Sequence, residues 1–336
     1  MNDKLAAQAG RDEIAVVTPV LNDWVSLGRL IAEIDGLPAL DGRRLTILAV
    51  DDGSFPPAPA DALAAAVSGR GAIVAVTVVQ LAANLGHQRA IAAGLVEARR
   101  LGGFERVMVM DADGEDRPQD VAALIDASDS HRSAIILALR GRRSEGLGFR
   151  VGYFVYRLLF RVLTGHRIQF GNFCILPGAF LTALTHSPAV WNSLVAGIMR
   201  SRLPMLSIPT MRGERYAGRS RMNFVSLTTH GLSIISVYMD VVLIRIICAA
   251  LAVSVVIVIA GLVVVGLKLF TGFAIPGWAS TIGVSLLVLL IQALMFASVA
   301  LFQFLSLRSM PTVAPATFAP QLIERVVEVM PPAQRP

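Results

Sequence analysis

The chain has few cysteines and few charged residues for its 336 residues. Its two cysteines, Cys174 and Cys248, lie far apart, and no C-x-x-C pair or Cys/His cluster occurs. This argues against a disulfide scaffold and against a structural zinc site. Only 16% of the residues are charged and 54% are hydrophobic, whereas soluble domains have about 25% and about 45–50%. The composition excludes a mainly disordered chain and indicates a protein that is partly embedded in a membrane.

Lysine is also scarce. Lys4 and Lys268 are the only lysines, so the net charge of +6 comes almost entirely from arginine. A net positive charge favours binding to anionic lipids, phosphate-bearing ligands or nucleic acid. The sequence lacks the interleaved aromatic and basic residues of common RNA-binding and oligonucleotide-binding domains. We therefore expect no nucleic-acid partner.

Charge is absent from two long stretches near the C-terminus. These are Ile246–Leu267 and Leu269–Leu307, the second being most apolar at Ile282–Leu305. A membrane-spanning helix needs ~20 apolar residues, so both stretches qualify. The connector between them contains glycine, proline and Trp278, which suits a turn at a membrane interface. Two membrane spans are predicted, and the alternative is a pair of helices buried in a soluble core.

The orientation follows from the arginines. The first apolar run is short and follows Arg11, Asp12 and Glu13, which is not the pattern of a signal peptide. Arginine is dense before the first span and resumes at Arg308, while the connector side has only Lys268. The positive-inside rule places the N-terminal part in the cytoplasm. We expect a multi-pass protein of the inner (plasma) membrane.

The N-terminal part alternates between two patterns. Short apolar runs rich in β-branched residues predict strands at Ile14–Val20, Leu45–Asp52, Ala72–Leu81 and Arg106–Asp113. Helical patterns lie between them at Val25–Ile34, Ala60–Val67 and Gln88–Arg99. Strand–helix alternation with continuous apolar strands predicts an α/β domain whose mostly parallel sheet is covered on both faces.

Polar residues follow three of these strands. They are Asn22 and Asp23, Asp51–Ser54, and Asp111–Asp116. Ligands of parallel sheets bind at the carboxyl ends of the strands. The sequence therefore predicts a ligand site at this edge.

The third of these segments packs four carboxylates into six residues. Such a density of negative charge is unfavourable unless a cation is bound, and hard oxygen ligands suit Mg²⁺ or Mn²⁺. We expect Asp111 and Asp113, which follow the strand directly, to bind metal or ligand. For Asp116 and Asp120 we favour a solvated turn that caps the next helix, because Pro118 suits a first helical position.

Two further segments have the character of interfacial helices. Residues 150–164 combine an apolar stripe with Arg150, Arg157 and Arg161, a pattern that can lie in the headgroup plane of a membrane. The alternative is an ordinary surface helix packed on the sheet. Phe224–Tyr238 leads directly into the first span. The tail after Arg308 is rich in proline and is expected to be loose.

These motifs, in their order, carry a resemblance. The segments are VVTPVLND (Val16–Asp23), VDDGS (Val50–Ser54), NLGHQRAIAAGL (Asn84–Leu95), VMVMDADGEDRP (Val107–Pro118) and ERYAGRSRMN (Glu214–Asn223). Followed by two spans, they resemble the family 2 glycosyltransferases of the GT-A fold over roughly residues 12–310. More narrowly, they resemble the polyprenyl-phosphate glycosyltransferases, which include dolichol-phosphate mannose synthase and bacterial GtrB-type enzymes.

The resemblance implies a role for particular residues. It assigns metal binding to Asp111, Asp113 and Glu115, where Glu115 replaces a frequent glutamine of the family. It assigns substrate binding to Pro19, Asn22, Asp23, Asp51, Asp52, His87, Asp111, Ala112, Arg140, Ser220 and Arg221. For His87 a structural hydrogen-bonding role stays open. It assigns catalytic roles to Asp113, Asn172 and Arg215. Arg142 and Arg143 add a second basic loop beside Arg140, for which general contact with anionic headgroups is the alternative.

The sequence departs from the family pattern at several of these positions. Leu21 and Asp23 replace a tyrosine and a glutamate of the first turn, and Arg221 replaces a lysine. Asn172 stands where GtrB-like relatives often have an aspartate proposed as catalytic base. An asparagine takes no proton, and a hydroxyl acceptor needs a base. A phosphate monoester is largely dianionic at neutral pH and is already a nucleophile, so the substitution favours a lipid phosphate as acceptor.

The sequence thus predicts a membrane-anchored, metal-dependent inverting glycosyltransferase that moves a sugar from a UDP- or GDP-linked donor to polyprenyl (undecaprenyl) phosphate. Its expected parts are a cytoplasmic GT-A domain at 1–222, an interfacial helix at 223–240, two spans within 241–307 and a cytoplasmic tail at 308–336. Membrane lipids are expected partners, and a homo-oligomer is left open. A processive polysaccharide synthase is disfavoured by the absence of a Q-x-x-R-W motif. A non-catalytic membrane scaffold of the same fold is the other alternative.

Overall fold

The computed structural model describes residues 13–68, 71–140, 157–166, 170–216, 224–271, 277–310 and 312–330. These residues fall into two compact units. The first comprises Met1–Leu147, Ile168–Val237 and Val313–Pro336, and the second comprises Gly148–Arg167 and Tyr238–Thr312.

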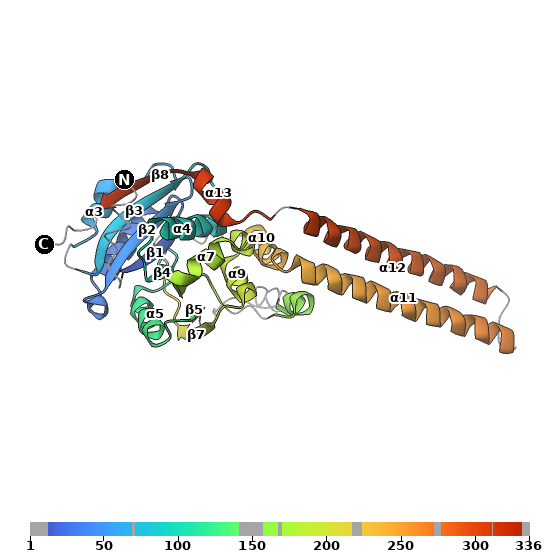
Figure 1. The fold of residues 1–336 in the computed structure, drawn as a ribbon. Coiled ribbons are helices and arrows are strands. Elements are labelled where there is room, and N and C mark those ends of the chain that lie inside the picture. The colour runs from blue at the N-terminus through green and yellow to red at the C-terminus, as the bar shows by residue number, and fades with distance from the viewer. Residues whose placement is uncertain are drawn as a thin grey trace. The chain divides into compact units, whose positions relative to one another are not determined.

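A parallel sheet forms the centre of the first unit (Figure 1). Its four central strands run in the order β4-β1-β2-β3 and are all parallel to their neighbours. They are β1 (Glu13–Val20), β2 (Arg44–Asp51), β3 (Ile73–Leu81) and β4 (Arg106–Val109). Because parallel strands end at the same edge, the loops after β1, β2 and β4 meet there. The predicted mostly parallel α/β fold is confirmed, with strand bounds within a few residues of the expected ones.

The sheet extends beyond this core on both sides. β6 (Cys174–Pro177) runs antiparallel to β4, and β5 (Ile135–Arg140) and β7 (Met205–Thr210) follow it. β6 begins where β4 ends, since Cys174 pairs with Val109. The residues that lead into β6 therefore lie at the same edge as the loop after β4.

Helices cover both faces of the sheet (Figure 1). Within β1, Val16 packs into one hydrophobic core and Val17 into the other, as the period of two in a strand requires. The first core is completed by α2 (Trp24–Asp35), α3 (Ala60–Ala65) and α5 (Pro118–Ser130). The second is completed by α4 (His87–Leu101), α7 (Leu181–Thr185), α8 (Ala189–Asn192), α9 (Leu194–Ser201) and α13 (Pro315–Leu322).

Helix α4 lies unusually close to the sheet. A Cβ atom added to Gly94 would stand 2.4 Å from Val17 Cγ1 and 2.7 Å from Val50 Cγ2. Glycine is therefore the residue that permits this approach. The close contact with β1 and β2 positions His87, the first residue of α4, at the edge where these strands end.

The C-terminal segment corrects one expectation. Within its described residues the tail after Arg308 is not loose: β8 (Ile323–Met330) pairs antiparallel with β3 over most of its length. Val326 packs against the second core, and Met330 against the first. The prolines that suggested a loose tail include Pro315, which occupies the first turn of α13, a position that tolerates a missing N–H.

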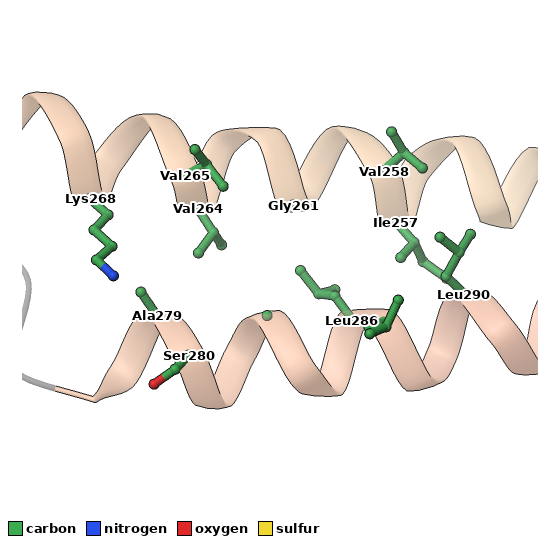
Figure 2. A pocket seen from close by; sticks show the side chains of 12 residues that line it. Ile257, Val258, Gly261, Val264, Val265, Lys268, Ala279, Ser280, Leu286 and Leu290 are labelled. Atoms are coloured by element: carbon green, nitrogen blue, oxygen red, sulfur yellow. The ribbon is translucent and has the colours of Figure 1, made fainter.

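The second unit contains two long apolar helices, α11 (Met239–Phe270) and α12 (Trp278–Ser309). Helix α10 (Phe224–Ser236), which precedes α11 in the sequence, belongs to the first unit. Both are long and apolar enough to cross a membrane, with mean hydropathies of 3.1 and 2.5. They lie side by side (Figure 1). Between them is an open groove of about 390 Å³, into which Lys268 points from α11 toward Ala279 of α12 (Figure 2).

A short helical segment at 157–164 packs within the same unit. Phe160 is buried and meets the ring of Tyr238 edge-on at 6.0 Å, and Arg245 of α11 donates to the carbonyl oxygen of Val162. Three large apolar side chains of the segment are instead exposed, namely Leu158, Leu159 and Val162. The first part of the predicted interfacial helix, with Arg150, lies outside the described residues.

Candidate active site at the carboxyl ends of the central strands

The acid loop, Asp111–Asp116, follows β4 and is shaped by its own hydrogen bonds. Asp116 is buried, and its Oδ2 accepts from the backbone N–H of Asp111 at 2.9 Å. Asp113 Oδ1 accepts from the N–H of Glu115 at 3.0 Å. The expectation for Asp116 was therefore wrong: it does not lie in a solvated cap but fixes the loop from inside. The N-cap position of α5 is occupied by Arg117, with Pro118 next.

A second segment, the arginine arm at Met211–Tyr216, lies against the acid loop. The two segments form an antiparallel bridge between Asp116 and Arg212. The N–H of Gly213 donates to the carbonyl oxygen of Glu115 at 3.0 Å, and the N–H of Tyr216 donates to that of Asp113 at 2.8 Å. This backbone pairing fixes which arm side chains can reach the carboxylates.

The arm directs two guanidinium groups at those carboxylates. Arg215 Nη2 lies 2.6 Å from Asp113 Oδ2 and 3.6 Å from Glu115 Oε1. Arg212 forms a short ion pair with the other oxygen of Glu115. All four side chains are at most 29% exposed, so these pairs are stronger than ordinary surface salt bridges.

Even so, negative charge prevails around Asp113. Burial raises the pKa of Asp113, and the charges of Asp111 and Glu115 add to the rise, which Arg215 only partly opposes. Carboxylates are suitable ligands for a hard divalent cation. A bound cation would neutralise the negative charges of Asp111 and Glu115, which contribute to the raised pKa of Asp113. In the described arrangement, however, no group of three or more His, Cys, Asp or Glu side chains is gathered to hold a metal, because the arginines occupy the oxygens of Asp113 and Glu115.

Tyr216 anchors the far end of the arm. Its ring lies against Gly114, where a Cβ atom would stand 2.9 Å from the ring atoms and where φ is +86°. Its hydroxyl donates to Glu33 Oε2 at 2.8 Å, and the guanidinium of Arg29 lies 4.4 Å from the ring centre. The arm is thus connected to helix α2 as well as to the acid loop.

The loops after β1 and β2 are joined to each other. Asn22 has a left-handed backbone with φ of 54°, its N–H donates to Ser54 Oγ at 2.9 Å, and its Oδ1 accepts from the N–H of Phe55 at 2.7 Å. Asp51 is buried and accepts from the N–H of Ser54 at 2.8 Å. Asp23 occupies the N-cap position of α2 without a side-chain cap bond, and Pro19 is a buried residue within β1.

Asp52 links this pair of loops to the start of α4. Its two oxygens accept from the N–H groups of Leu85 at 2.6 Å and Gly86 at 3.0 Å. Burial raises the pKa of Asp52, and these two bonds oppose the rise. Gly86, with φ of +89°, is the N-cap residue of α4.

His87 and Asn172 complete the contacts around the acid loop. His87 Nε2 lies 3.3 Å from Asp111 Oδ1 and 3.1 Å from Asn172 Nδ2. Desolvation opposes the charged form of the imidazole, but the charges of Asp111, Asp113 and Asp116 outweigh it and raise the pKa of His87. Asn172 reaches this position because it immediately precedes the strand antiparallel to β4.

The structure therefore brings most of the predicted site residues together. Asn22 bonds to the loop after β2, Asp52 bonds to the residues just before His87, His87 contacts Asp111 and Asn172, and Asp113 pairs with Arg215. Ala112 is buried within the acid loop. Arg140 ends β5 with its backbone paired to Thr210, just before the arm. Ser220, Arg221, Arg142 and Arg143 lie outside the described residues.

Three residues of this site were not predicted. Arg212 and Tyr216 take their roles from the pairing of the arm with the acid loop, which no spacing in the sequence encodes. Gln88 bonds to Asn172 at 3.2 Å, although 84 residues separate the two in the sequence. The sequence did offer a signal for Tyr216, because this residue lies inside the motif around Arg215.

Comparison with known proteins agrees with this geometry. Residues 15–182 match the family described as Glycosyl transferase family 2. The chain belongs to this family. The match includes the acid loop, His87 and Asn172, and ends before the arginine arm. Membership of this family and the mostly parallel α/β fold are both as the sequence predicted.

Two relatives have polyprenyl phosphates in their names. An undecaprenyl-phosphate 4-deoxy-4-formamido-L-arabinose transferase of Klebsiella pneumoniae (strain 342) is 25% identical over 221 residues, which cover 64% of this chain and 64% of the relative. A dodecaprenyl-phosphate galacturonate synthase of Rhizobium johnstonii is 27% identical over 143 residues, 41% of this chain and 39% of the relative. The chain thus spans less than two thirds of the length of these relatives.

Among solved structures, a glucosyl-3-phosphoglycerate synthase of Mycobacterium tuberculosis, in complex with Mn²⁺, uridine-diphosphate-glucose and phosphoglyceric acid, is 19% identical with a TM-score of 0.48. The match covers 72% of this chain and 82% of that protein.

Proposed function

We propose that this glycosyltransferase moves one sugar from a nucleotide-sugar to a polyprenyl phosphate, with undecaprenyl phosphate as the preferred acceptor, and inverts the anomeric carbon. The observation that carries the proposal is the pairing of Arg215 with Asp113 at the carboxyl ends of the parallel strands. It puts cationic donors and carboxylates side by side, which is what a departing diphosphate and its counter-ion require.

On the donor side, the loops after β1 and β2 are the proposed binding site for the nucleoside. Asn22 and Asp51 hold these two loops together, so the surface that meets the base and ribose is rigid. Arg215 and Arg212 would bind the diphosphate oxygens. To do so they must exchange the carboxylates of Asp113 and Glu115 for phosphate, so donor binding involves a movement of the arginine arm.

The proposed cofactor is Mg²⁺ or Mn²⁺. Asp113 and Glu115 would hold it, with Asp111 beside them, and the donor chemistry of three carboxylates fits a hard cation. Such a cation supplies Lewis-acid neutralisation of the leaving diphosphate.

On the acceptor side, the proposed nucleophile is a phosphate oxygen of the lipid, which attacks the anomeric carbon in line with departure of the nucleoside diphosphate. No general base is required for this step, because the phosphate is already anionic. Asn172, which takes no proton, is proposed to position the phosphate. This assignment depends on its place beside His87 and the acid loop.

The membrane setting supports a lipid acceptor. The exposed apolar side chains of the 157–164 segment, Leu158, Leu159 and Val162, belong to the same compact unit as α11 and α12. The chain leaves the first unit after Val237 and returns to it at Val313. Because the chain starts from and returns to the same unit, it must cross a membrane an even number of times. We therefore expect α11 and α12 to cross as a pair or not at all. We propose that they cross the inner membrane with the catalytic unit on the cytoplasmic side.

The test is a donor screen. Membranes containing the full chain would be incubated with Mn²⁺ or Mg²⁺, undecaprenyl phosphate and labelled UDP- and GDP-sugars, and label entering the organic phase would be counted. We expect transfer from one class of donor, abolished by a chelator and restored by added cation. Failure of every donor, with folded protein and lipid phosphate present, would refute the proposed function and favour a scaffold.

A matched pair of variants tests the carboxylate assignment. Asp113→Ala is expected to lower the rate by about 100-fold or more. Asp126→Ala removes a carboxylate that is 75% exposed and belongs to α5, and is expected to leave the rate unchanged. Full transfer by the Asp113→Ala enzyme would contradict the site.

A further inference from the structure

Gln88, the second residue of α4, connects two segments that are distant in the sequence. Its Oε1 accepts from the backbone N–H of Leu194 at 3.0 Å, and its Nε2 donates to Asn172 Oδ1 at 3.2 Å. Leu194 is the first residue of α9, where a backbone N–H has no partner within its own helix. The carboxamide of Gln88 therefore caps α9 on one side and holds Asn172 on the other.

The direction of this chain of hydrogen bonds is determined by its first member. The N–H of Leu194 can only donate, so the oxygen of Gln88 must face it and the NH₂ group of Gln88 must face Asn172. Asn172 must then present its oxygen to Gln88. Its own NH₂ group consequently points the other way, to His87 Nε2 at 3.1 Å.

The end of the chain lies at the acid loop. The same Nε2 atom of His87 is 3.3 Å from Asp111 Oδ1. The amide nitrogen of Asn172 and Asp111 Oδ1 therefore both lie close to His87 Nε2. The amide nitrogen of Asn172 has two N–H bonds, and one of them faces His87.

We propose that Gln88 is a positioning residue that orients the amide of Asn172, so that residue 172 presents N–H donors, and no oxygen, to the acceptor phosphate. This inference rests on the proposed function for its substrate. An asparagine amide fits its space equally well either way round, so a neighbour must select the orientation. An N–H group binds an anionic phosphate oxygen, whereas a carbonyl oxygen in its place repels it.

The decisive variant is Gln88→Glu, which separates positioning from capping. One carboxylate oxygen still accepts from the N–H of Leu194, so the cap of α9 is kept. The other oxygen now requires a donor, so Asn172 turns its NH₂ toward residue 88 and its oxygen toward His87.

The first readout is the side-chain amide of Asn172, which needs no substrate. The full chain would be labelled with ¹⁵N-asparagine in detergent, and an Asn172→Ala variant assigns the signal. We expect the NH₂ resonances of Asn172 to shift in Gln88→Glu, because one of these N–H groups then bonds to residue 88. Unchanged NH₂ resonances of Asn172 in Gln88→Glu would overturn the proposal.

The second readout is acceptor kinetics. Gln88→Glu is expected to raise the KM for undecaprenyl phosphate by about tenfold while the KM for the nucleotide-sugar changes less than about twofold. Gln88→Met, which removes the cap of α9, is expected to lower the Tm. If Gln88 only capped α9, Gln88→Glu would behave like the unmodified enzyme, and this result would refute the positioning role.

The two readouts separate the possible failures. If the unmodified chain transfers no sugar to a polyprenyl phosphate, the proposed function fails, and the side-chain resonances of Asn172 still decide how the amide is oriented. If the unmodified chain is active and Gln88→Glu matches it in these resonances and in acceptor KM, only the positioning role fails.

Discussion

The hydroxyl of Tyr216 donates a hydrogen bond of 2.8 Å to Glu33 Oε2, across 183 residues of sequence. This contact ties the arginine arm to helix α2, while the ring of Tyr216 lies against Gly114 of the acid loop. The guanidinium of Arg29, which is paired with Glu33 at 2.9 Å, covers the same ring. The position of Arg215 at the acid loop therefore depends on a contact outside the loop.

Loss of this contact should weaken the arm. We expect Tyr216→Phe to raise the KM for the nucleotide-sugar by about 3- to 10-fold, because a hydrogen bond worth about 1 kcal/mol no longer orders the arm. Glu33→Ala should have a similar effect, and the double variant should be no worse than either single one, since both remove the same bond. Additive effects in steady-state kinetics would contradict this coupling.

Gly94 should not tolerate a side chain. Gly94→Ala forces a methyl group against Val17 and Val50, and overpacking of this kind costs about 1–3 kcal/mol. Gly28→Ala is the matched control, because a Cβ atom there meets nothing within 4 Å and alanine favours a helix by about 1 kcal/mol. Thermal unfolding in detergent should show a lower Tm for Gly94→Ala only. Equal Tm values would mean that α4 is not packed as closely as described.

Asp129 should make stability depend on pH in the acid range. Burial alone would raise the pKa of Asp129, but ion pairs with Arg43 and Arg106, each at 2.7 Å, outweigh it and lower the pKa. A lowered pKa in the folded state gives stability that is present above the unfolded value of ~3.9 and is lost as pH falls through the folded value. Asp129→Asn should therefore lower the Tm at neutral pH and have little effect at about pH 2.

The control for this prediction is Asp126→Asn. Asp126 is 75% exposed and stands 3.4 Å from Arg43, so its pair should contribute close to nothing. A pH-independent loss of Tm in Asp129→Asn would show that the change acts through packing and not through charge.

Strand β8 should protect β3 from solvent. Removing residues 323–330 exposes the edge of β3, whose residues from Val76 to Leu81 pair with β8. Hydrogen exchange should accelerate at the amides of β3 that face β8, while those of β1, in the centre of the sheet, stay protected. Glu324→Gln, at an exposed position of β8, should leave the exchange unchanged. Unaltered protection of β3 in the truncated chain would argue against the pairing.

Much of the fold was predictable because it is encoded locally. β-branched runs in the central strands and helical periodicity in α2 and α4 are properties of neighbouring residues, and burial on both faces follows from continuous apolar strands. The site could be placed at the carboxyl ends of these strands for the same reason, since parallel strands bring their exits to one edge. The uncharged runs of α11 and α12 were recognised from length and composition alone.

The role of single side chains was less predictable. Asp116 was expected in solvent but is buried, because its carboxylate bonds the N–H of Asp111. The tail was expected to be loose because it is rich in proline. Its composition does not reveal the edge of β3, with which β8 pairs. Gln88 lies inside a recognised motif, but its partners could not be predicted, since Asn172 and Leu194 are 84 and 106 residues away in the sequence.

Amino-acid order by itself determined that this protein has a parallel α/β unit with an acidic strand exit, a basic segment and two membrane-length helices. Each of these depends on spacing and composition within a short stretch. Only the tertiary structure decided that Arg215 meets Asp113, that Tyr216 meets Glu33 and that Gln88 turns Asn172. The physical reason is that a hydrogen bond acts over about 3 Å in space, and only folding brings residues that are 84 to 183 positions apart within that distance.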